Sequence, residues 1–176
     1  MARTSGDFLE KRLINACEQY RIAGKAVISK VPTPFKVFTD HQRKHSHIRT
    51  GVFEKKSTVD FEGTSQGRSI AFEAKSTIEH TRFPLKNIEE HQIYYLRDTQ
   101  DQGGVCFFLI EFAKTGEVFY ITFDQVYEWW QGFIRDGKKS IPKKWFDMNC
   151  PKVSHSRFMQ LDFLKCVFPE IFGQTS

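Results

Sequence analysis

The spacing of apolar residues near the start of the chain indicates a helix. Apolar side chains recur there at intervals of three and four positions: Leu9, Leu13, Ala16, Cys17 and Tyr20. The spacing predicts a helix over Thr4 to Tyr20, with Thr4 and Asp7 as a capping pair. Gly24 is expected to end it, because glycine readily takes the left-handed conformation that follows many helices.

The next apolar runs are short and bounded by Pro, Gly and polar residues, as is typical of strands. They read AVISKV, FKVF, GVCFFLIEF and EVFYITF, and the last two are expected to pair around Lys114–Gly116. A helix is predicted from Ile88 to about Thr99, with Asn87 as its N-cap and Glu90 as the capping partner. A short helix is expected over Asp124 to Trp130. This order of elements predicts an α/β fold.

Composition narrows the class of protein. The chain has 176 residues, 40% apolar and 27% charged, which favours one globular domain over residues 1–176. The longest apolar run, VCFFLI, is far shorter than the roughly 20 residues that span a bilayer, and no secretory signal is visible. Four scattered cysteines without CxxC spacing predict reduced thiols in a cytoplasmic protein. The net charge of +5 favours a polyanionic partner.

The stretch TVDFEGTSQGRSIAFEAKST, residues 58–77, carries acids where a plain core strand would carry Val or Ile. A hairpin with the two-residue loop Gln66-Gly67 would place Asp60 opposite Glu73, with Cβ atoms about 5 Å apart. Lys75 would then lie on the same face as Glu73, because side chains two apart in a strand share a face. Two facing carboxylates repel each other unless a cation lies between them.

This patch has the composition that metal-assisted phosphodiester cleavage requires. Hard oxygen ligands hold Mg²⁺, which activates a water, and a lysine stabilises the charge that develops on the phosphate. Thr58 shares the face of Asp60 and adds a hydroxyl. Glu10 lies at the edge of the apolar face of the first helix, and Gln92 lies on the face of the later helix expected to pack on the sheet. The alternative is structural: short D…ExK patterns also occur in salt-bridged surface strands, and Glu10 and Gln92 could be boundary residues.

An ordered set of segments resembles the RecU family of Holliday-junction resolvases. The segments are VPTP (31–34), STVDFEG (57–63), GRSIAFEAK (67–75), RFPLKNIEEHQ (82–92), GGVCFFLIEF (103–112) and KKSIPKKWF (138–146). The resemblance runs from about Ser5 to Lys165 and is specific, because FPLKNxxxHQ is not a general feature of the wider PD-(D/E)xK nuclease superfamily. It implies a restriction-endonuclease-like fold: a central mixed sheet flanked by helices, with a β-stalk inserted at about residues 35–55.

The resemblance also implies an activity and a site. Its members are homodimers that nick two opposed strands of a four-way DNA junction with Mg²⁺, for which Mn²⁺ can substitute. Four positions match the family's metal-site residues, namely Thr58, Asp60, Glu73 and Gln92. Lys75 matches the lysine that stabilises the transition state, and Glu10 matches an acidic residue on the first helix. A RecA-type recombinase or a branch-migration helicase is a further partner that the resemblance suggests.

The region of the stalk departs from the family pattern. It is rich in His and lacks the usual Pro-Lys-Arg-Ser-type turn, so its tip, and with it junction selectivity and recombinase contact, is expected to differ. Basic residues are predicted to contact phosphates, with solvated loops as the alternative: Arg43, Lys44, Arg49, Lys138, Lys139, Lys143 and Lys144. A zinc site at His41, His45 and His47 is disfavoured, because no Cys or acidic fourth ligand is well placed.

Two other functions are compatible with the sequence. One is a structure-tolerant nuclease that acts on flaps or replication forks. The other is a junction-binding protein that modulates a recombinase and cleaves little. Against the second, each expected catalytic position holds the expected type of residue.

Overall fold

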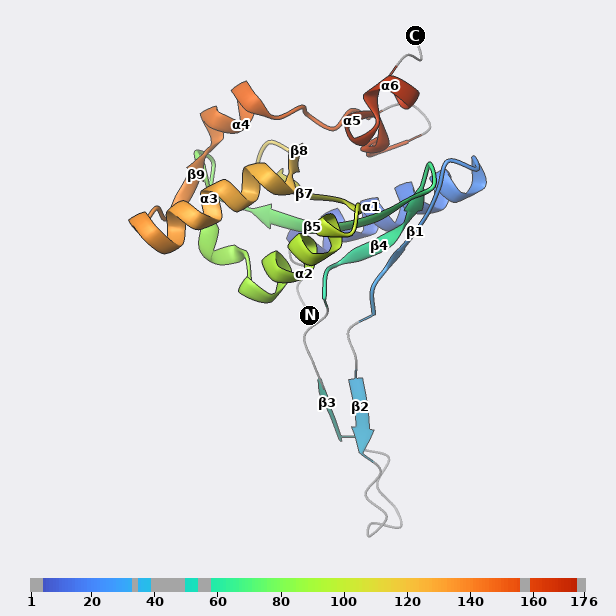
Figure 1. The fold of residues 1–176 in the computed structure, drawn as a ribbon, viewed down its shortest axis with the longest axis horizontal. Coiled ribbons are helices and arrows are strands. Elements are labelled where there is room, and N and C mark those ends of the chain that lie inside the picture. The colour runs from blue at the N-terminus through green and yellow to red at the C-terminus, as the bar shows by residue number, and fades with distance from the viewer. Residues whose placement is uncertain (1–4, 33–34, 39–49, 54–57, 156–158, 174–176) are drawn as a thin grey trace.

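The computed structural model describes residues 5–32, 35–38, 50–53, 58–155 and 159–173. Its centre is a five-stranded sheet in the order β1–β4–β5–β7–β8 (Figure 1). These strands are β1 (Ala26–Lys30), β4 (Phe61–Ser65), β5 (Arg68–Thr77), β7 (Val105–Phe112) and β8 (Glu117–Thr122). All neighbours are antiparallel except β5 and β7, which run parallel. The sheet is therefore mixed, as the resemblance to the RecU family implied.

The β4–β5 hairpin has the predicted register. Its ladder pairs Phe61 with Phe72 and Ser65 with Arg68 across a two-residue turn. Both turn residues have positive φ, 53° at Gln66 and 72° at Gly67, which matches the right-handed twist of the flanking strands. The first strand is shorter than expected, because β4 begins at Phe61 and Thr58 to Asp60 precede it.

Helices cover both faces of the sheet. On one face, the apolar side of α1 (Ser5–Ile22) packs on the stacked rings of Phe61, Phe72 and Phe107. Helices α2 (Glu90–Asp101) and α3 (Phe123–Asp136) cover the other face. Two short helices near the C-terminus, α5 (Leu164–Val167) and α6 (Pro169–Phe172), pack on the α1 side.

Two helix boundaries differ from the predictions. The start of α2 was predicted wrongly: its N-cap is Glu89, which forms a capping box with Gln92, whereas Asn87 lies in the preceding 3-10 helix η1 (Leu85–Asn87). Helix α3 is twice as long as the short helix expected, because Thr122 caps its start and its apolar face continues to the left-handed Gly137. The Glu89–Gln92 capping box fixes the orientation of the Gln92 side chain.

The connection between β5 and β7 contacts the basic segment around β9, ahead of α2. It contains β6 (Arg82–Pro84), which pairs with β9 (Ser140–Pro142), the strand before α4 (Lys143–Asn149). Separately, β2 (Phe35–Phe38) and β3 (Thr50–Phe53) form an antiparallel ribbon that projects from the body of the molecule at the position expected for the stalk (Figure 1).

The four cysteines carry free thiols. Cys17, Cys106 and Cys150 are buried, and burial raises the pKa of each thiol to about 12. Among the helices in the described part of the chain, none has the length and apolar character needed to cross a membrane.

Gly63 provides a test of the β1–β4 pairing. A Cβ at this position would lie 2.0 Å from the carbonyl oxygen of Val27, which is backbone and cannot rotate away. We expect Gly63→Ala to lower the free energy of unfolding by about 3 kcal/mol, measured by urea denaturation. The exposed neighbour Thr64→Ala is the control and should change it by less than about 0.5 kcal/mol. An unchanged urea midpoint for Gly63→Ala would show that β1 can shift away from the added methyl group without loss of stability.

Candidate active site

Asp60 and Glu73 lie side by side at the start of the β4–β5 hairpin. The backbone N–H of Asp60 donates to Glu73 Oε2 at 3.1 Å, and the backbone N–H of Ala74 donates to Asp60 Oδ2 at 3.0 Å. Each carboxylate is thus held by backbone of the other strand. The two acids that the register placed opposite each other therefore form one site on the α2 face of the sheet.

Two further side chains contact Glu73 at its other oxygen. Lys75 Nζ lies 2.8 Å from Glu73 Oε1, and the Lys75 side chain is only 17% exposed. Gln92 Nε2 donates to the same oxygen from helix α2. The capping box fixes this orientation, because Gln92 Oε1 accepts the backbone N–H of Glu89 at 3.0 Å. In this arrangement Gln92 serves as a hydrogen-bond donor to Glu73.

The electrostatics of the site favour a bound cation. Glu73 is 1% exposed, and burial raises the pKa of its carboxyl to about 8, with Asp60 adding to the shift and Lys75 opposing it. One lysine thus faces two carboxylates. The donor set fits Mg²⁺, which usually keeps several waters and needs only one or two protein carboxylates. Within the described residues no group of three or more His, Cys, Asp and Glu side chains is suited to a metal, so zinc-like coordination is not seen there.

Thr58 and Glu10 lie at the edge of this cluster. Thr58 Oγ1 donates to Glu62 Oε1 at 3.1 Å and is exposed. Glu10 Oε2 lies 2.6 Å from Lys30 Nζ, with both side chains about one third exposed. Lys30 pairs with Phe61, the residue after Asp60, so the Glu10–Lys30 ion pair flanks the start of β4. The structure brings these residues near the site without direct contact with Glu73.

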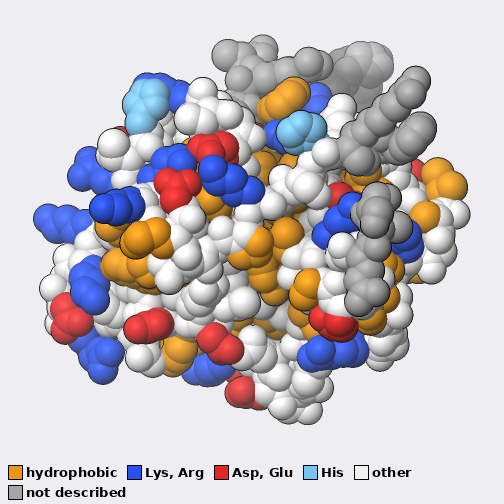
Figure 2. Space-filling view, turned by 90° about the horizontal axis from the view of Figure 1, so that it is seen from above, with side chains coloured by type: hydrophobic (Ala, Val, Ile, Leu, Met, Phe, Trp, Pro, Cys, Tyr) orange, Lys and Arg blue, Asp and Glu red, His pale blue; other side chains and the backbone are white. Residues whose placement is uncertain are grey.

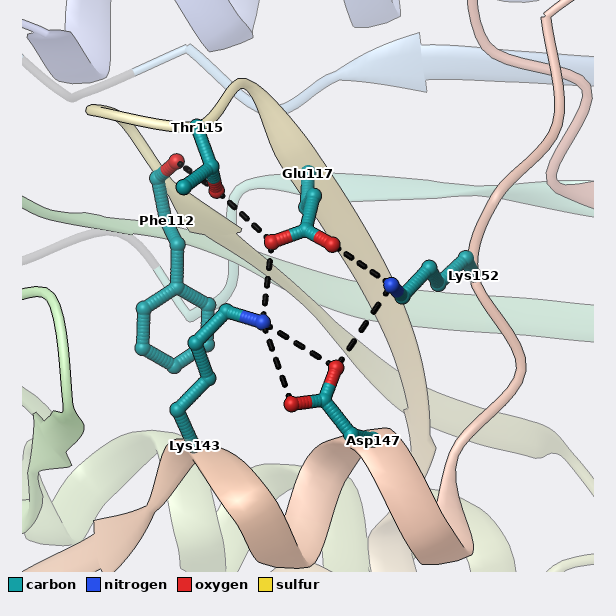
Figure 3. A network of polar contacts seen from close by, with 6 residues as sticks. All are labelled: Phe112, Thr115, Glu117, Lys143, Asp147 and Lys152. Atoms are coloured by element: carbon teal, nitrogen blue, oxygen red, sulfur yellow. Dashed lines mark hydrogen bonds and ion pairs between the residues drawn. The ribbon is translucent and has the colours of Figure 1, made fainter.

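The predicted phosphate contacts divide into three groups. Lys138, Lys139 and Lys144 are exposed, as a DNA contact requires. Lys143 is 17% exposed, and its ammonium lies 2.9 Å from Glu117 and 3.0 Å from Asp147 (Figure 3). It also lies over the rings of Phe112 and Phe119. The charge of Lys143 is therefore neutralised by two carboxylates of the protein, which argues against the predicted phosphate contact at this residue. The third group lies outside the described residues: Arg43, Lys44 and Arg49. The same holds for the histidines of the disfavoured zinc site, His41, His45 and His47.

Sequence reasoning missed Lys86 as a companion of the basic loop. The backbone N–H of Leu85 donates to the carbonyl of Lys139 at 3.0 Å, which places the exposed Lys86 beside Lys139. The two lysines are far apart in the chain, and only the β6–β9 pairing joins them.

Comparison with known families decides the affiliation of the chain. A family model described as "Recombination protein U" matches residues 4–168. The chain belongs to the RecU family. A relative named "Holliday junction resolvase RecU" from Pediococcus pentosaceus is 34% identical over 164 residues, which cover 92% of this chain and 82% of the relative. A second RecU protein of that name, from a Geobacillus species, is 38% identical over 141 residues, 79% of this chain and 70% of the relative.

A solved structure is similar to this RecU chain at low sequence identity. The Holliday junction resolvase Hjc from Archaeoglobus fulgidus superposes with a TM-score of 0.47 and 9% identity, over 85% of this chain and 92% of that one. Membership of the RecU family rests on the family model and the sequence relatives.

Proposed function

We propose that this chain is a structure-selective endodeoxyribonuclease that resolves four-way DNA junctions by paired, Mg²⁺-dependent nicks. The observation that carries the proposal is the contact of Asp60, Glu73 and Lys75 at one end of a hairpin. A buried acid such as Glu73, with a second acid and a lysine beside it, is costly for the fold, and such an arrangement is expected to serve a function. The names of the RecU relatives support the choice of a four-way junction as the substrate.

In the reaction, Asp60 and Glu73 would hold Mg²⁺. A Mg²⁺ bound there supplies Lewis-acid stabilisation of the phosphate and lowers the pKa of a bound water. Lys75 orients the attacking water and compensates the negative charge that develops on the phosphate oxygens. Gln92 Nε2 donates a hydrogen bond to Glu73 Oε1, while Glu73 Oε2 accepts the backbone N–H of Asp60. Gln92 therefore orients the Glu73 carboxylate beside Asp60. The water oxygen bonds to phosphorus as the bond to the 3′-oxygen breaks, so the products carry 5′-phosphates.

DNA is expected to approach from the side of the ribbon and the N-terminal end of α2. Lys86 and Lys139 lie beside each other just before the helix that carries Gln92. Lys138 is exposed next to Lys139, and Lys144 is exposed in the first turn of α4. The opposite face is less suited to a polyanion: Figure 2 shows Lys and Arg side chains there beside Asp and Glu. Lys143 and Lys152 are also less available to a polyanion, because both are paired with Glu117 and Asp147.

A homodimer suits this task. A four-way junction is close to two-fold symmetric and resolution needs two nicks, so two copies of the site related by a two-fold axis match it. We place the reaction in the cytoplasm, in keeping with four free thiols. The ribbon β2–β3 is our candidate for contact with the junction centre and with a RecA-type recombinase or branch-migration helicase.

The deciding experiment compares substrates. A strand-labelled mobile four-way junction, a flap and a linear duplex are each incubated with wild-type protein in Mg²⁺ or in EDTA. Symmetric paired nicks on the junction that need Mg²⁺ would support the proposal. Equal cutting of all three substrates would leave a nuclease without junction selectivity, and binding without cleavage in either buffer would leave a junction-binding protein.

The lysines offer a separate prediction. Lys143→Ala should lower the free energy of unfolding by about 1–2 kcal/mol, because it removes hydrogen bonds to two carboxylates while Glu117 keeps Lys152. Its junction affinity should stay unchanged. The double variant Lys139→Ala/Lys144→Ala should keep normal stability but bind the junction more weakly. The slope of the logarithm of the binding constant against the logarithm of the salt concentration should become shallower by about one unit per lost phosphate contact. Weaker binding by Lys143→Ala, measured by fluorescence anisotropy, would contradict this division.

A further inference from the structure

The side-chain amide of Gln92 is held at both of its polar atoms. Its Nε2 donates to Glu73 Oε1, and its Oε1 accepts the backbone N–H of Glu89 at 3.0 Å. The reciprocal contact, from the backbone N–H of Gln92 to the carboxylate of Glu89, completes the capping box of helix α2. Gln92 is buried, so both halves of its amide are used inside the protein.

The two neighbours of this amide allow only one orientation. The backbone N–H of Glu89 can only donate, so it needs the amide oxygen opposite it. Glu73 Oε1 also accepts the ammonium of Lys75 at 2.8 Å, so this oxygen is an acceptor and needs the NH2 group. A reversed amide would set two donors against each other at Glu89 and two acceptors against each other at Glu73. The hydrogen-bond network therefore assigns the oxygen of Gln92 to Glu89 and its nitrogen to Glu73.

This orientation conflicts with one expectation from the family resemblance, which counts Gln92 among the metal-site residues. A glutamine binds Mg²⁺ through its oxygen, whereas the NH2 group of Gln92 is the end that faces Glu73. To reach the metal with its oxygen, the amide would have to turn and give up its hydrogen bonds to both Glu73 and Glu89. The N–H of Glu89 would then lose its acceptor, which costs free energy at the start of the helix.

We propose that the capping box of α2 decides the role of Gln92: the backbone N–H of Glu89 retains the amide oxygen, so Gln92 is a positioning residue for Glu73 and not a metal ligand. Asp60 and Glu73 are then the carboxylates that hold the metal. The main chain of Glu89 thereby becomes part of the site, although the side chain of Glu89 points to no substrate or metal. The inference rests on the proposed nuclease function and narrows the metal site within it.

Amide hydrogen exchange at Glu89, followed by NMR with and without Mg²⁺, tests the assignment directly. The amide signals of Asp60 and Ala74, which contact the two carboxylates, report that Mg²⁺ has bound. The exchange rate of the Glu89 N–H should not rise on binding. A rise of about tenfold or more would show that the amide turns toward the metal and would overturn the proposal. If Mg²⁺ changes neither reporter signal, the metal site of the proposed function fails, and this inference fails with it.

Glu89→Pro removes the N–H that holds the amide, because proline has no backbone N–H. Glu89 and Ile88 both have extended backbone, with φ of −99° and −92°, which suits a proline and the residue before it. We expect kcat for junction nicking to fall about tenfold, the scale of one hydrogen bond to the charged Glu73, with KM changed less than about twofold. Glu89→Ala loses the carboxylate and keeps the N–H, so its kcat should stay above that of Glu89→Pro. Equal kcat values for the two variants, or a kcat for Glu89→Pro at or above that of wild type, would overturn the proposal.

Helix α3 supplies a matched control, because it begins with a capping box of the same kind. The backbone N–H of Thr122 donates to Gln125 Oε1 at 3.1 Å, and the backbone N–H of Gln125 donates to Thr122 Oγ1 at 3.3 Å. Gln125 Nε2 donates to the carbonyl of Asn149 rather than to a carboxylate of the site. Gln125→Ala should therefore lower the free energy of unfolding and leave kcat unchanged. A loss of kcat in Glu89→Pro that only follows a loss of folded protein, measured by urea unfolding, overturns the positioning role, whereas a wild-type protein that nicks nothing overturns the proposed function as well.

Discussion

Glu73→Ala is expected to reduce Mg²⁺-dependent nicking of a four-way junction by about a thousandfold or more. Glu73 is the one residue that contacts the Asp60 backbone, Lys75 and Gln92 together. A bound metal supplies several kcal/mol of transition-state stabilisation, and each loss of about 1.4 kcal/mol is a factor of ten in rate, which gives this magnitude. Single-turnover nicking of a strand-labelled junction measures it.

The same variant should bind the junction nearly as well as wild type, because the affinity comes from phosphate contacts that it leaves intact. Asp60→Ala should behave in the same way. Glu79→Ala, which removes an exposed glutamate outside the site, is the control for a general effect of lost negative charge. Substantial nicking by Glu73→Ala would show that the hairpin acids are structural and would exclude them as the catalytic site.

The stability of the metal-free protein is expected to fall as pH rises toward 8, and Glu73 is the reason. In the unfolded chain this carboxyl ionises near the ordinary glutamate pKa of 4.5, whereas burial raises the pKa in the folded protein to about 8. Between these values the folded state binds the extra proton. Stability from this group is therefore complete below about pH 4.5 and is lost as pH rises through about 8, by on the order of a few kcal/mol.

Glu73→Gln removes the titration and keeps the size of the side chain. In EDTA, we expect this variant to be more stable than wild type near pH 8 and nearly equal to it near pH 5, measured by urea unfolding. Mg²⁺ should stabilise wild type more at the higher pH, because binding requires the ionised carboxylate, and should not stabilise Glu73→Gln. A variant that is less stable than wild type near pH 8 would show that ionised Glu73 is already compensated by Lys75.

The hairpin of the candidate active site could be predicted from sequence because its geometry is local. A two-residue turn at Gln66-Gly67 fixes the register, and the register alone places Asp60 opposite Glu73. The alternation of side chains then sets Lys75 on the same face. The fold class follows from the periodic patterns, since long amphipathic helices and apolar strands of this kind are typical of α/β proteins.

The rest of the site depends on tertiary contacts that local patterns do not encode. Asn87 has the better N-cap propensity, yet Glu89 caps α2, because the chain at Asn87 is held in a 3-10 turn before α2. Lys143 and Lys144 are neighbours in one basic run, but only the structure shows that the ammonium of Lys143 lies between two acids and two rings.

The buried thiols give the protein natural reporters of local opening. A thiol with a pKa of about 12 is almost wholly uncharged at neutral pH, and the thiolate is the form that an alkylating reagent attacks. Cys17 lies in α1, Cys106 in β7 and Cys150 directly after α4. Alkylation of each should therefore wait for the opening of its own region. Their separate labelling rates, read by mass spectrometry, would rank the breathing motions of three parts of the native nuclease without any engineered probe.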